Sequence, residues 1–524
     1  MADSPSQKKY KCQLCDFEMD EKPVNGKCPS CGRKAVKLGP ELGTWTGNHP
    51  IENCGCAYCK DQSLRTISEK IIELADDKTT LKEIAPTIAA YLMHRFWIYT
   101  FSDNEEVVLY SAEKGIYERG GEVKLKGIAQ EIINIADTRG NFGKKSAEEV
   151  VGHVQRSTYI ERENFEPPLN FVCLQNGIYD TEKGEFLQHS PEMRFLTKLG
   201  INYKPGADCP KISEFLSQVL QPEDVPMLEE LCGYLLLRDY RFQKAFMFNG
   251  EGSNGKSTLL NIIIKFLGEE NVSHIALQDL TESRFAIVNL YCKYANVYAD
   301  LSDRALKDSG RFKMLTGGDP IYAEQKFRAH FRFDNFAKLL FSCNRIPLSR
   351  DNSDAFFRRW VILDFKNQFL GKSEKRNLSA ELTTEVELSG LLNLALLGLD
   401  RLLINNEFTN IESVDKMRET YIRKSDSIHA FAMDMLEPSI DGAIPKPELW
   451  TRYLKYCGDN RVLVAIEKAF WERIPQLFQV ESAQLSISGK KGVRAFRGIT
   501  WKRLDNDEHK DVVEKEEPQR KLDD

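Results

Sequence analysis

The chain has 524 residues, of which 42% are hydrophobic and 29% are charged, and its formal net charge at pH 7 is -6. Because this length is several times that of a typical domain, we expect two to four domains, each with its own hydrophobic core. The negative net charge excludes a uniformly basic nucleic-acid coat, so binding to DNA or RNA would require local basic surfaces. No segment approaches the ~20 uninterrupted apolar residues of a membrane helix, and we expect no membrane contact.

The first residues, MADSPSQKKYKCQ, lack the apolar core of a secretory signal. We therefore expect a cytoplasmic protein whose cysteines remain thiols or metal ligands rather than disulfides. The chain has 13 cysteines, and seven of them lie before residue 60. This clustering, in a stretch with little periodic apolar pattern, predicts a small zinc-binding module over residues 1–65 that needs metal because it cannot bury a core.

Two groups of cysteines define this module. The stretch CQLCDFEMDEKPVNGKCPSCG contains two C-x₂-C pairs separated by twelve residues, and this spacing predicts a zinc ribbon with a closed, structural Zn²⁺ site. The predicted ligands are Cys12, Cys15, Cys28 and Cys31. A second group either closes another Zn²⁺ site or supplies free thiols, and it comprises His49, Cys54, Cys56 and Cys59. The module could contact DNA or protein, and its basic residues are Lys8, Lys9, Lys11, Arg33, Lys34 and Lys37.

A mixed α+β domain is predicted over residues 66–205. LKEIAPTIAAYLMHRFWIYTF carries apolar residues at helical spacing, whereas NFVCLQNGIYDTEKGEFLQHS is typical of strands with a turn at Asn176-Gly177. An α/β ATPase core follows over residues 206–425. The short apolar runs KAFMFN, YANVYAD and AKLLFSCN are typical of buried strands in a parallel sheet, and they alternate with helical segments.

The strand KAFMFN is followed by a complete phosphate-loop motif, G-x-x-x-x-G-K-[ST], and then by the helix KSTLLNIIIKFLG. Glycines in such a loop let backbone N–H groups approach phosphate oxygens, and the helix N-terminus adds a favourable dipole. Lys256 would contact the β and γ phosphates of ATP, and Ser257 would ligate Mg²⁺. The predicted nucleotide-binding residues are Gly250, Gly252, Asn254, Gly255, Lys256, Ser257 and Thr258.

Further candidates for the hydrolysis site end the neighbouring strands. Asp300 closes YANVYAD, where a carboxylate can hold Mg²⁺, although Leu301 occupies the position of the usual second acid. Asp303 could orient the attacking water or be an ordinary surface acid. Asn344 closes AKLLFSCN, and its amide could hold the water or the γ-phosphate. The arginine pair in DAFFRRW, which could reach a neighbouring subunit's nucleotide, is Arg358 and Arg359.

A basic segment, GGDPIYAEQKFRAHFRF, follows the second strand of the core. Its alternating residues Lys326, Arg328 and His330 would share one face of a strand, either gripping DNA phosphates or lying on a solvated surface. Helices followed by the basic hairpin AQLSISGKKGVRAFRGITWKRL predict a winged-helix-like domain over residues 426–503. The highly charged residues 504–524 are predicted to be disordered.

The order of these motifs resembles the superfamily 3 helicase core of phage, plasmid and poxvirus-type primase-helicases. The resemblance rests on FNGEGSNGKST, LQDLTESRFA, YANVYADLSD, FKMLTGGDPIYAEQKF, AKLLFSCNRIP and DAFFRRW, and it covers about residues 70 to 503. It implies an AAA+ type ring, usually a hexamer, that moves 3′ to 5′ on single-stranded DNA. By this resemblance Lys256 and Ser257 bind phosphate and metal, Asp300 is the metal carboxylate and Asn344 the sensor.

The resemblance also assigns a trans-acting finger to one of the two arginines, with Arg359 slightly favoured, and a DNA-gripping hairpin to the basic segment. Many relatives carry a primase-polymerase domain before the helicase, whereas a short zinc module stands here. We therefore expect no primer synthesis by this polypeptide, and a separate primase or loader as a partner. The expected function is an ATP- and Mg²⁺-dependent replicative helicase of a virus, plasmid or integrated element, acting in a prokaryotic cell or an infected host on forked DNA.

Two alternatives belong to other classes. A nucleotide-controlled DNA-binding regulator or initiator would use the zinc ribbon and winged helix to bind a site, and would hydrolyse ATP without processive unwinding. A small-molecule kinase would need an acceptor-site lid, which the sequence does not show, and it would leave the accessory modules without a role.

Overall fold

A computed structural model gives the fold. It describes residues 81–136, 145–324, 330–369, 378–460, 462–487 and 490–502, together with the backbone of three two-residue strands near the start of the chain. These strands form an antiparallel sheet with the order β2-β1-β3, and they are β1 (Tyr10–Lys11), β2 (Glu18–Met19) and β3 (Val36–Lys37). The charged tail, all the predicted zinc ligands and two predicted DNA-binding residues lie outside the described residues. The zinc ligands are Cys12, Cys15, Cys28, Cys31, His49, Cys54, Cys56 and Cys59, and the DNA-binding residues are Lys326 and Arg328.

The chain forms two compact units. The first consists of residues 1–301, 308–344 and 359–411, and the second of residues 302–307, 345–358 and 412–524. Each has its own buried core, as expected for a chain of this length. The predicted domain boundaries remain predictions.

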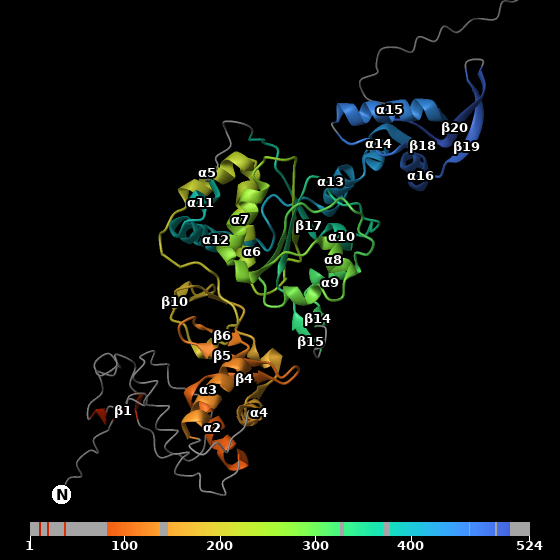
Figure 1. The fold of residues 1–524 in the computed structure, drawn as a ribbon. Coiled ribbons are helices and arrows are strands. Elements are labelled where there is room, and N and C mark those ends of the chain that lie inside the picture. The colour runs from red at the N-terminus through yellow and green to blue at the C-terminus, as the bar shows by residue number, and fades with distance from the viewer. Residues whose placement is uncertain are drawn as a thin grey trace, which may run out of the picture. The chain divides into compact units, whose positions relative to one another are not determined.

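The first unit opens with an α+β domain, coloured orange in Figure 1. Its four-stranded sheet has the order β6-β5-β4-β7, with β4 and β7 parallel and the other pairs antiparallel. The helices bury one apolar face each, including Ile88, Leu125 and Val150, in a shared core. The elements are α2 (Leu81–Arg95), β4 (Ile98–Phe101), β5 (Val107–Ser111), β6 (Ile116–Arg119), α3 (Gly121–Ala136), α4 (Ser146–Ser157) and β7 (Tyr159–Ile160).

An antiparallel meander of β8 (Phe171–Cys173), β9 (Ile178–Asp180) and β10 (Glu185–Leu187) follows. The turn predicted at Asn176-Gly177 connects β8 to β9, where Leu174 donates its N–H to the Gly177 carbonyl at 2.8 Å. A Cβ at Gly177 would lie 2.5 Å from the Leu187 carbonyl oxygen, so this turn can pack against β10 only with glycine.

A five-stranded parallel sheet forms the centre of the first unit, with the order β12-β13-β16-β11-β17. Its strands are β11 (Ala245–Asn249), β12 (Val272–Ser273), β13 (Ala295–Tyr298), β16 (Lys338–Cys343) and β17 (Trp360–Asp364). Both faces of the sheet are covered, which explains why the strands are continuous apolar runs rather than alternating ones. The predicted α/β core with a parallel sheet is therefore confirmed.

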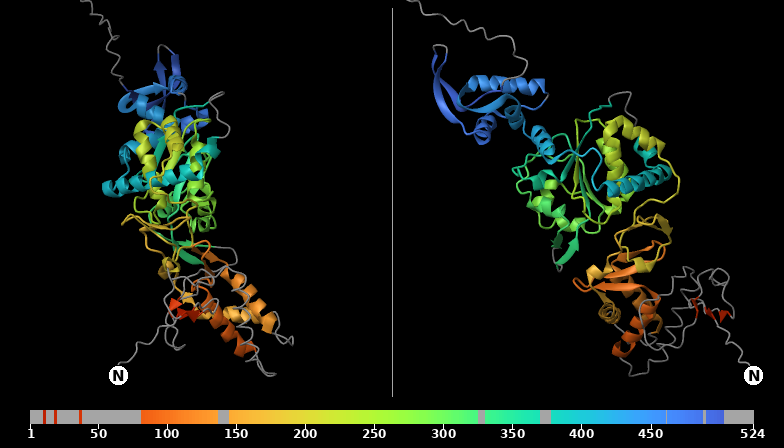
Figure 2. Two further views of the ribbon diagram at one scale, coloured as in Figure 1. Left: turned by 90° about the vertical axis from the view of Figure 1, so that its left-hand side faces the viewer. Right: turned by 180° about the vertical axis from the view of Figure 1, so that it is seen from behind.

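Helices cover this sheet on both sides (Figures 1 and 2). One side carries α5 (Pro210–Val219), α6 (Val225–Leu236), α7 (Lys256–Leu267), α11 (Leu378–Leu382) and α12 (Glu385–Asn405). The other carries α8 (Leu277–Glu282) and α9 (Gly310–Leu315). Connections that switch sides place a crevice outside the carboxyl ends of parallel strands, where α/β proteins bind ligands.

The helices α6 and α12 pack closely because glycines stand where they meet. A Cβ at Gly233 would lie 2.5 Å from the Ala395 carbonyl oxygen, and one at Gly398 would lie 2.5 Å from that of Glu229. Beside this contact the fully buried Glu230 accepts hydrogen bonds from Arg401 Nε at 2.7 Å and Thr409 N at 2.7 Å. The buried carboxylate is thus paired, as a charge in such a position must be.

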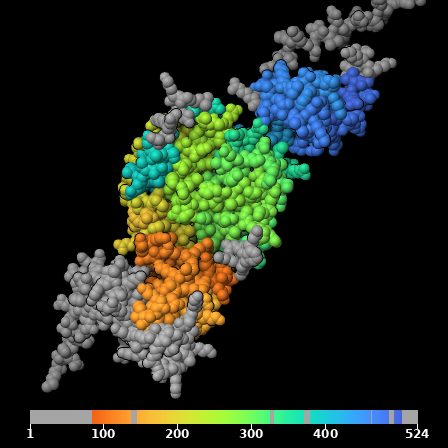
Figure 3. Space-filling model, in the orientation of Figure 1, coloured from red at the N-terminus to blue at the C-terminus, as the bar shows by residue number. Residues whose placement is uncertain are grey.

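The opposite face of α12, whose surface is teal in Figure 3, exposes apolar side chains. Val386, Leu397 and Ile404 are 59%, 62% and 83% exposed. Their spacing of eleven and seven residues places them on one side of the helix. The helix therefore has one buried face and one apolar face in contact with solvent.

The second unit has its own core around Phe431, Tyr453, Phe470 and Phe496. Its strands form an antiparallel sheet with the order β18-β20-β19. The elements are α10 (Asp354–Phe357), α13 (Val414–Ser425), α14 (Ser427–Met435), β18 (Leu436–Pro445), α15 (Lys446–Asp459), α16 (Glu467–Leu477), β19 (Glu481–Ile487) and β20 (Lys490–Trp501).

The strand β18 was not expected from the sequence. LEPSIDGAIP contains two prolines and an Asp-Gly pair, which are typical of loops. The structure accommodates them because β18 is an edge strand whose register shifts between Pro438 and Ala443.

None of the described helices is long and apolar enough to cross a membrane.

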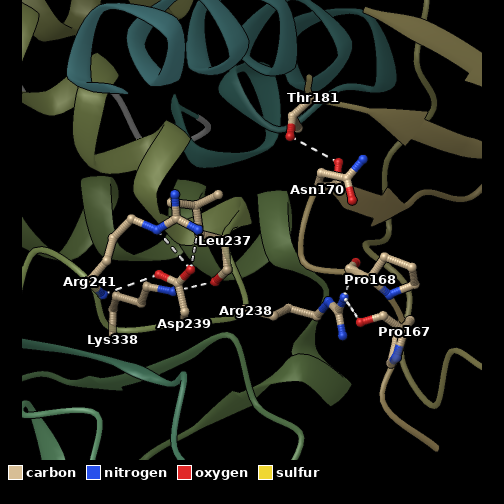
Figure 4. A network of polar contacts seen from close by, with 9 residues as sticks. All are labelled: Pro167, Pro168, Asn170, Thr181, Leu237, Arg238, Asp239, Arg241 and Lys338. Carbon is tan, nitrogen blue, oxygen red and sulfur yellow. Dashed lines mark hydrogen bonds and ion pairs between the residues drawn. The ribbon is translucent and has the colours of Figure 1, made fainter. Parts of the chain in front are cut away.

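A lysine is buried at the start of β16. Lys338 is 0% exposed, and its ammonium donates to the Leu237 carbonyl and lies 4.7 Å from the centre of the Tyr234 ring. Figure 4 shows Lys338 beside Asp239, which is held by Arg241 through Nε at 2.8 Å. Burial without a directly paired carboxylate lowers the pKa of Lys338 to about 7.

Lys338 is expected to make stability depend on pH. Between about pH 7 and 10.5 the unfolded chain holds this proton and the native protein does not, so the free energy of unfolding rises with pH. We expect Lys338→Met to be stabilised relative to the wild type below pH 7, by at most about 5 kcal/mol, and the difference to shrink towards pH 10. Urea unfolding of both proteins from pH 6 to 10 measures this, and a difference independent of pH would contradict it.

Candidate nucleotide-binding site

The loop between β11 and α7 is shaped by its two outer glycines. A Cβ on Gly250 would lie 2.6 Å from the Phe365 carbonyl oxygen. Gly255, which precedes the first residue of α7, has φ +90°, and a Cβ there would lie 2.6 Å from Val219 Cγ1. These positions accept only glycine, whereas a Cβ on Gly252 would meet nothing within 4 Å.

Lys256 begins α7 and is 5% exposed. Its ammonium donates to the carbonyl oxygens of Gly250 and of Glu251, the latter at 3.1 Å, and to Asn254 Oδ1 at 3.0 Å. The amine thus lies over the loop that would surround a phosphate chain. Desolvation lowers the pKa of Lys256, and the nearby Cys343 and Asp300 act in the opposite direction.

The first turn of α7 presents hydroxyl groups to this loop. Ser257 is exposed and Thr258 is half-buried, so the Ser257 hydroxyl is accessible to a metal ion or a phosphate. The helix continues for 12 residues, which gives its N-terminus the partial positive charge that attracts anions.

The carboxyl ends of β13 and β16 bring two further candidates to the same sheet edge. Asn344 follows β16, the direct neighbour of β11, and its Oδ1 accepts a hydrogen bond from Lys256 Nζ at 3.5 Å. Asp300 follows β13, which pairs with β16. Its backbone has φ 55°, an uncommon conformation for a residue other than glycine, and its side chain is exposed. Lys256, Asp300 and Asn344, far apart in sequence, therefore meet at one edge.

The segment after β17 braces the loop, and this was not anticipated from the sequence. Asn249 Nδ2 donates to Asp364 Oδ1 at 2.9 Å, Asn254 Nδ2 donates to the Phe365 carbonyl at 3.3 Å, and the Phe369 N–H donates to the Ser253 carbonyl at 2.8 Å. The signal available was that Asp364 ends an apolar strand, as Asp300 does. These contacts make β17 part of the nucleotide site's support.

The remaining predicted residues differ in accessibility. Arg359 is 7% exposed, and its carbonyl accepts the N–H of Ala245 at 2.7 Å, whereas Arg358 is exposed. Asp303 forms an exposed ion pair with Arg345 at 3.7 Å. Across the described part of the chain, no group of three or more His, Cys, Asp or Glu side chains could hold a metal ion.

The basic segment forms a hairpin of β14 (Pro320–Ala323) and β15 (Phe331–Asp334). Its strands alternate strictly: Phe331 and Phe333 are buried, while Tyr322, directly opposite Arg332, is 73% exposed. His330 is exposed at the start of β15. The hairpin therefore has one face anchored in the protein and one face available for contacts.

Two segments of this chain match family models, and part of it is similar to viral proteins. Residues 112–221 match the family model "D5 N terminal like", and residues 248–359 match the "Family of unknown function (DUF5906)". A segment of 230 residues is 28% identical to "Putative helicase 184R" of Invertebrate iridescent virus 6, covering 38% of this chain and 22% of that protein. Over these residues the chain is similar to D5-type primase-helicases.

A protein of Acanthamoeba polyphaga mimivirus that also carries a "Putative helicase" name is 27% identical over 219 residues, covering 39% of this chain and 22% of the relative. The chain thus spans less than a quarter of the length of these two D5-type relatives. A solved structure titled "The A form apo structure of NrS-1 C terminal region-CTR" aligns with 78% of this chain and 97% of its own, at 16% identity and a TM-score of 0.43. The resemblance expected from the motifs is confirmed at the level of the family.

The two loop glycines give a matched pair of variants. Gly255→Ala should raise the Kd for a fluorescent ATP analogue at least about tenfold, because alanine is strained at φ +90° and its Cβ meets Val219. Gly252→Ala should change this Kd less than about twofold, because the space around Gly252 is open. Equal effects of the two substitutions would mean that the loop does not hold the phosphates in this conformation.

Proposed function

We propose that this D5-type protein is an ATP-dependent DNA helicase that uses Mg²⁺. The observation that carries the proposal is the meeting of Lys256, Asp300 and Asn344 at the carboxyl edge of the parallel sheet, directly beside a glycine loop and the N-terminus of α7. The helicase names of the viral relatives support the same reading.

In the proposed reaction the protein supplies charge and position rather than a covalent intermediate. Lys256 exchanges its contacts with Gly250 and Asn254 for oxygens of the β and γ phosphates. Ser257 and Asp300 would hold Mg²⁺, which would supply positive charge against the phosphate chain. Asn344 orients the attacking water or senses the γ-phosphate.

DNA is assigned to the exposed face of the β14–β15 hairpin. Tyr322 offers an aromatic surface and Arg332 a neighbouring positive charge on that face. In the sequence, Lys326, Arg328 and His330 lie between the two strands and add basic groups. Phosphate contacts combined with an aromatic side chain suit binding of a single strand without preference for its sequence.

Assembly into a ring, the hexamer usual in superfamily 3, and 3′ to 5′ movement remain part of the proposal. Of the two arginines, the exposed Arg358 is the better candidate for reaching a neighbouring subunit, since Arg359 is buried. This choice reverses the slight preference based on the sequence.

The C-terminal unit is proposed to recruit DNA or a partner. Its order of helix, strand, two helices and two strands is that expected of a winged helix. Strand β20 exposes Arg494 and Arg497, so we propose that DNA meets the strand rather than the helix. Helix α16 exposes Glu467 and Glu472, and its exposed Lys468 is paired with Glu472 at 3.9 Å. The zinc ribbon and a separate primase or loader remain further proposals.

The helicase assignment predicts separation of a forked, labelled duplex by the purified chain with ATP and Mg²⁺. Lys256→Ala should lower the rate of ATP hydrolysis at least about 100-fold, because the charge that stabilises the transition state is lost, and strand separation should stop. Lys326→Ala should keep hydrolysis and lose separation. DNA binding and hydrolysis by the wild type without any strand separation would instead favour a nucleotide-controlled regulator.

The proposed ring makes a second prediction about Arg358. Arg358→Ala should lower ATP hydrolysis about 10³-fold, as removal of an arginine finger does. An equal mixture of Arg358→Ala and Lys256→Ala subunits should recover roughly a quarter of wild-type hydrolysis, because one interface in four then combines Lys256 with a neighbour's Arg358.

Arg359→Ala serves as the comparison in the same assay. Because Arg359 is buried, this variant should lower the melting temperature and gain nothing from mixing with Lys256→Ala. Recovery by Arg359→Ala but not by Arg358→Ala would assign the finger to the other arginine.

A further inference from the structure

One buried guanidinium joins the domain before the ATPase core to the core itself. Arg162, 7% exposed, lies in the short helix η2 (Arg162–Phe165) that follows β7. Its Nε and Nη2 donate to the two carboxylate oxygens of Asp103, both at 2.8 Å, and its Nη1 donates to the Tyr291 hydroxyl. Asp103 follows β4 of the preceding domain, and Tyr291 precedes β13 of the parallel sheet.

The same group lies against the base of the hairpin. The Arg162 guanidinium carbon is 4.0 Å from the ring centre of Phe101 and 4.8 Å from that of Phe331, the first residue of β15. The Tyr291 ring is 4.9 Å from Phe331 and 5.3 Å from Phe333. The buried face of the hairpin therefore rests on Tyr291.

Tyr291 is in turn held from the preceding domain. Arg119, at the end of β6, lies over its ring at 4.3 Å, while Arg162 donates to its hydroxyl. Arg162 is buried, whereas the Asp103 side chain keeps 26% of its exposure, so it is the guanidinium that loses water and needs its donors satisfied. The bidentate pair with Asp103 satisfies two of these donors and fixes the plane of the guanidinium. The contact therefore fixes Tyr291, and through it the hairpin, in one position.

We propose that Arg162 and Tyr291 form a positioning joint that holds the β14–β15 hairpin against the preceding domain. The inference rests on the proposed function, since the hairpin is assigned there to DNA. With the joint intact, the hairpin moves together with the preceding domain. Movement driven by ATP hydrolysis is then transmitted to DNA, because the hairpin does not shift independently of that domain. Arg162 and Tyr291 touch neither nucleotide nor DNA in this scheme.

A second arginine supplies a matched control. Arg238, after α6, donates to the carbonyls of Pro167 and Pro168, the former at 2.8 Å, and lies over the Phe195 ring at 5.2 Å (Figure 4). It joins the same two parts of the chain and also forms an ion pair with Glu166 at 3.8 Å, and none of these partners belongs to the hairpin. Arg238→Lys should therefore weaken the connection without releasing the hairpin.

The test compares Tyr291→Phe, Arg162→Lys and Arg238→Lys with the wild type. Tyr291→Phe removes only the hydroxyl, and we expect DNA-free ATP hydrolysis to stay within about twofold while base pairs separated per ATP fall roughly fivefold, a change within the range of coupling residues. Arg162→Lys, which cannot keep the bidentate pair, should lower the ratio at least as much. Arg238→Lys should keep the wild-type number of base pairs separated per ATP.

Hydrogen exchange of the free protein provides a readout that does not depend on helicase activity. Backbone amides of β14 and β15 should exchange faster in Tyr291→Phe and Arg162→Lys than in the wild type and Arg238→Lys, with the five-stranded sheet unchanged. Unchanged hairpin exchange in both variants would overturn the joint. A loss of ATP hydrolysis in the variants that matches their loss of strand separation would overturn it as well. If the hairpin exchanges faster in the two variants but the wild-type protein separates no DNA strands, the joint is retained and the helicase function is refuted.

Discussion

The candidate nucleotide site depends on a loop that must bring backbone groups close together around a buried ammonium. Gly250 and Gly255 have no room for a Cβ, and Lys256 is satisfied by loop oxygens and by Asn344. An unpaired buried ammonium would be costly, so these acceptors hold Lys256 in place, and in the proposed function phosphate oxygens would replace them. The strand order of the sheet, with β16 between β11 and β13, then places Asn344 and Asp300 at the same edge.

The proposed function links this edge to the hairpin through packed aromatic side chains rather than through a continuous strand. Phe331 and Phe333 rest on Tyr291, which two arginines of the preceding domain contact. In the proposed function this arrangement gives the preceding domain a physical part in the motor, since that domain contributes to the support of the element assigned to DNA. A hairpin with alternating buried and exposed residues suits such a role, because one face can be anchored while the other stays accessible.

Local patterns allowed the sequence to predict the parallel sheet, its continuous apolar strands and the family. The phosphate loop and the acid and amide after β13 and β16 were identified as candidates, and the structure brings Lys256, Asp300 and Asn344 together. What was missed depends on contacts between distant residues. Arg162 and Tyr291 are 129 positions apart, and no periodicity marks either. Strand β18 was not predicted because its prolines and glycine favour a loop. The burial that distinguishes Arg359 from Arg358 depends on tertiary structure, which local sequence does not reveal.

The central claim is that binding of ATP at this edge drives work on DNA. The most direct measurement is the rate of ATP hydrolysis by the purified chain with Mg²⁺, in the absence and presence of single-stranded DNA. The account predicts Mg²⁺-dependent hydrolysis that single-stranded DNA accelerates, because the hairpin and the nucleotide edge belong to one compact unit. Hydrolysis that is absent, or that single-stranded DNA leaves unchanged, would contradict it.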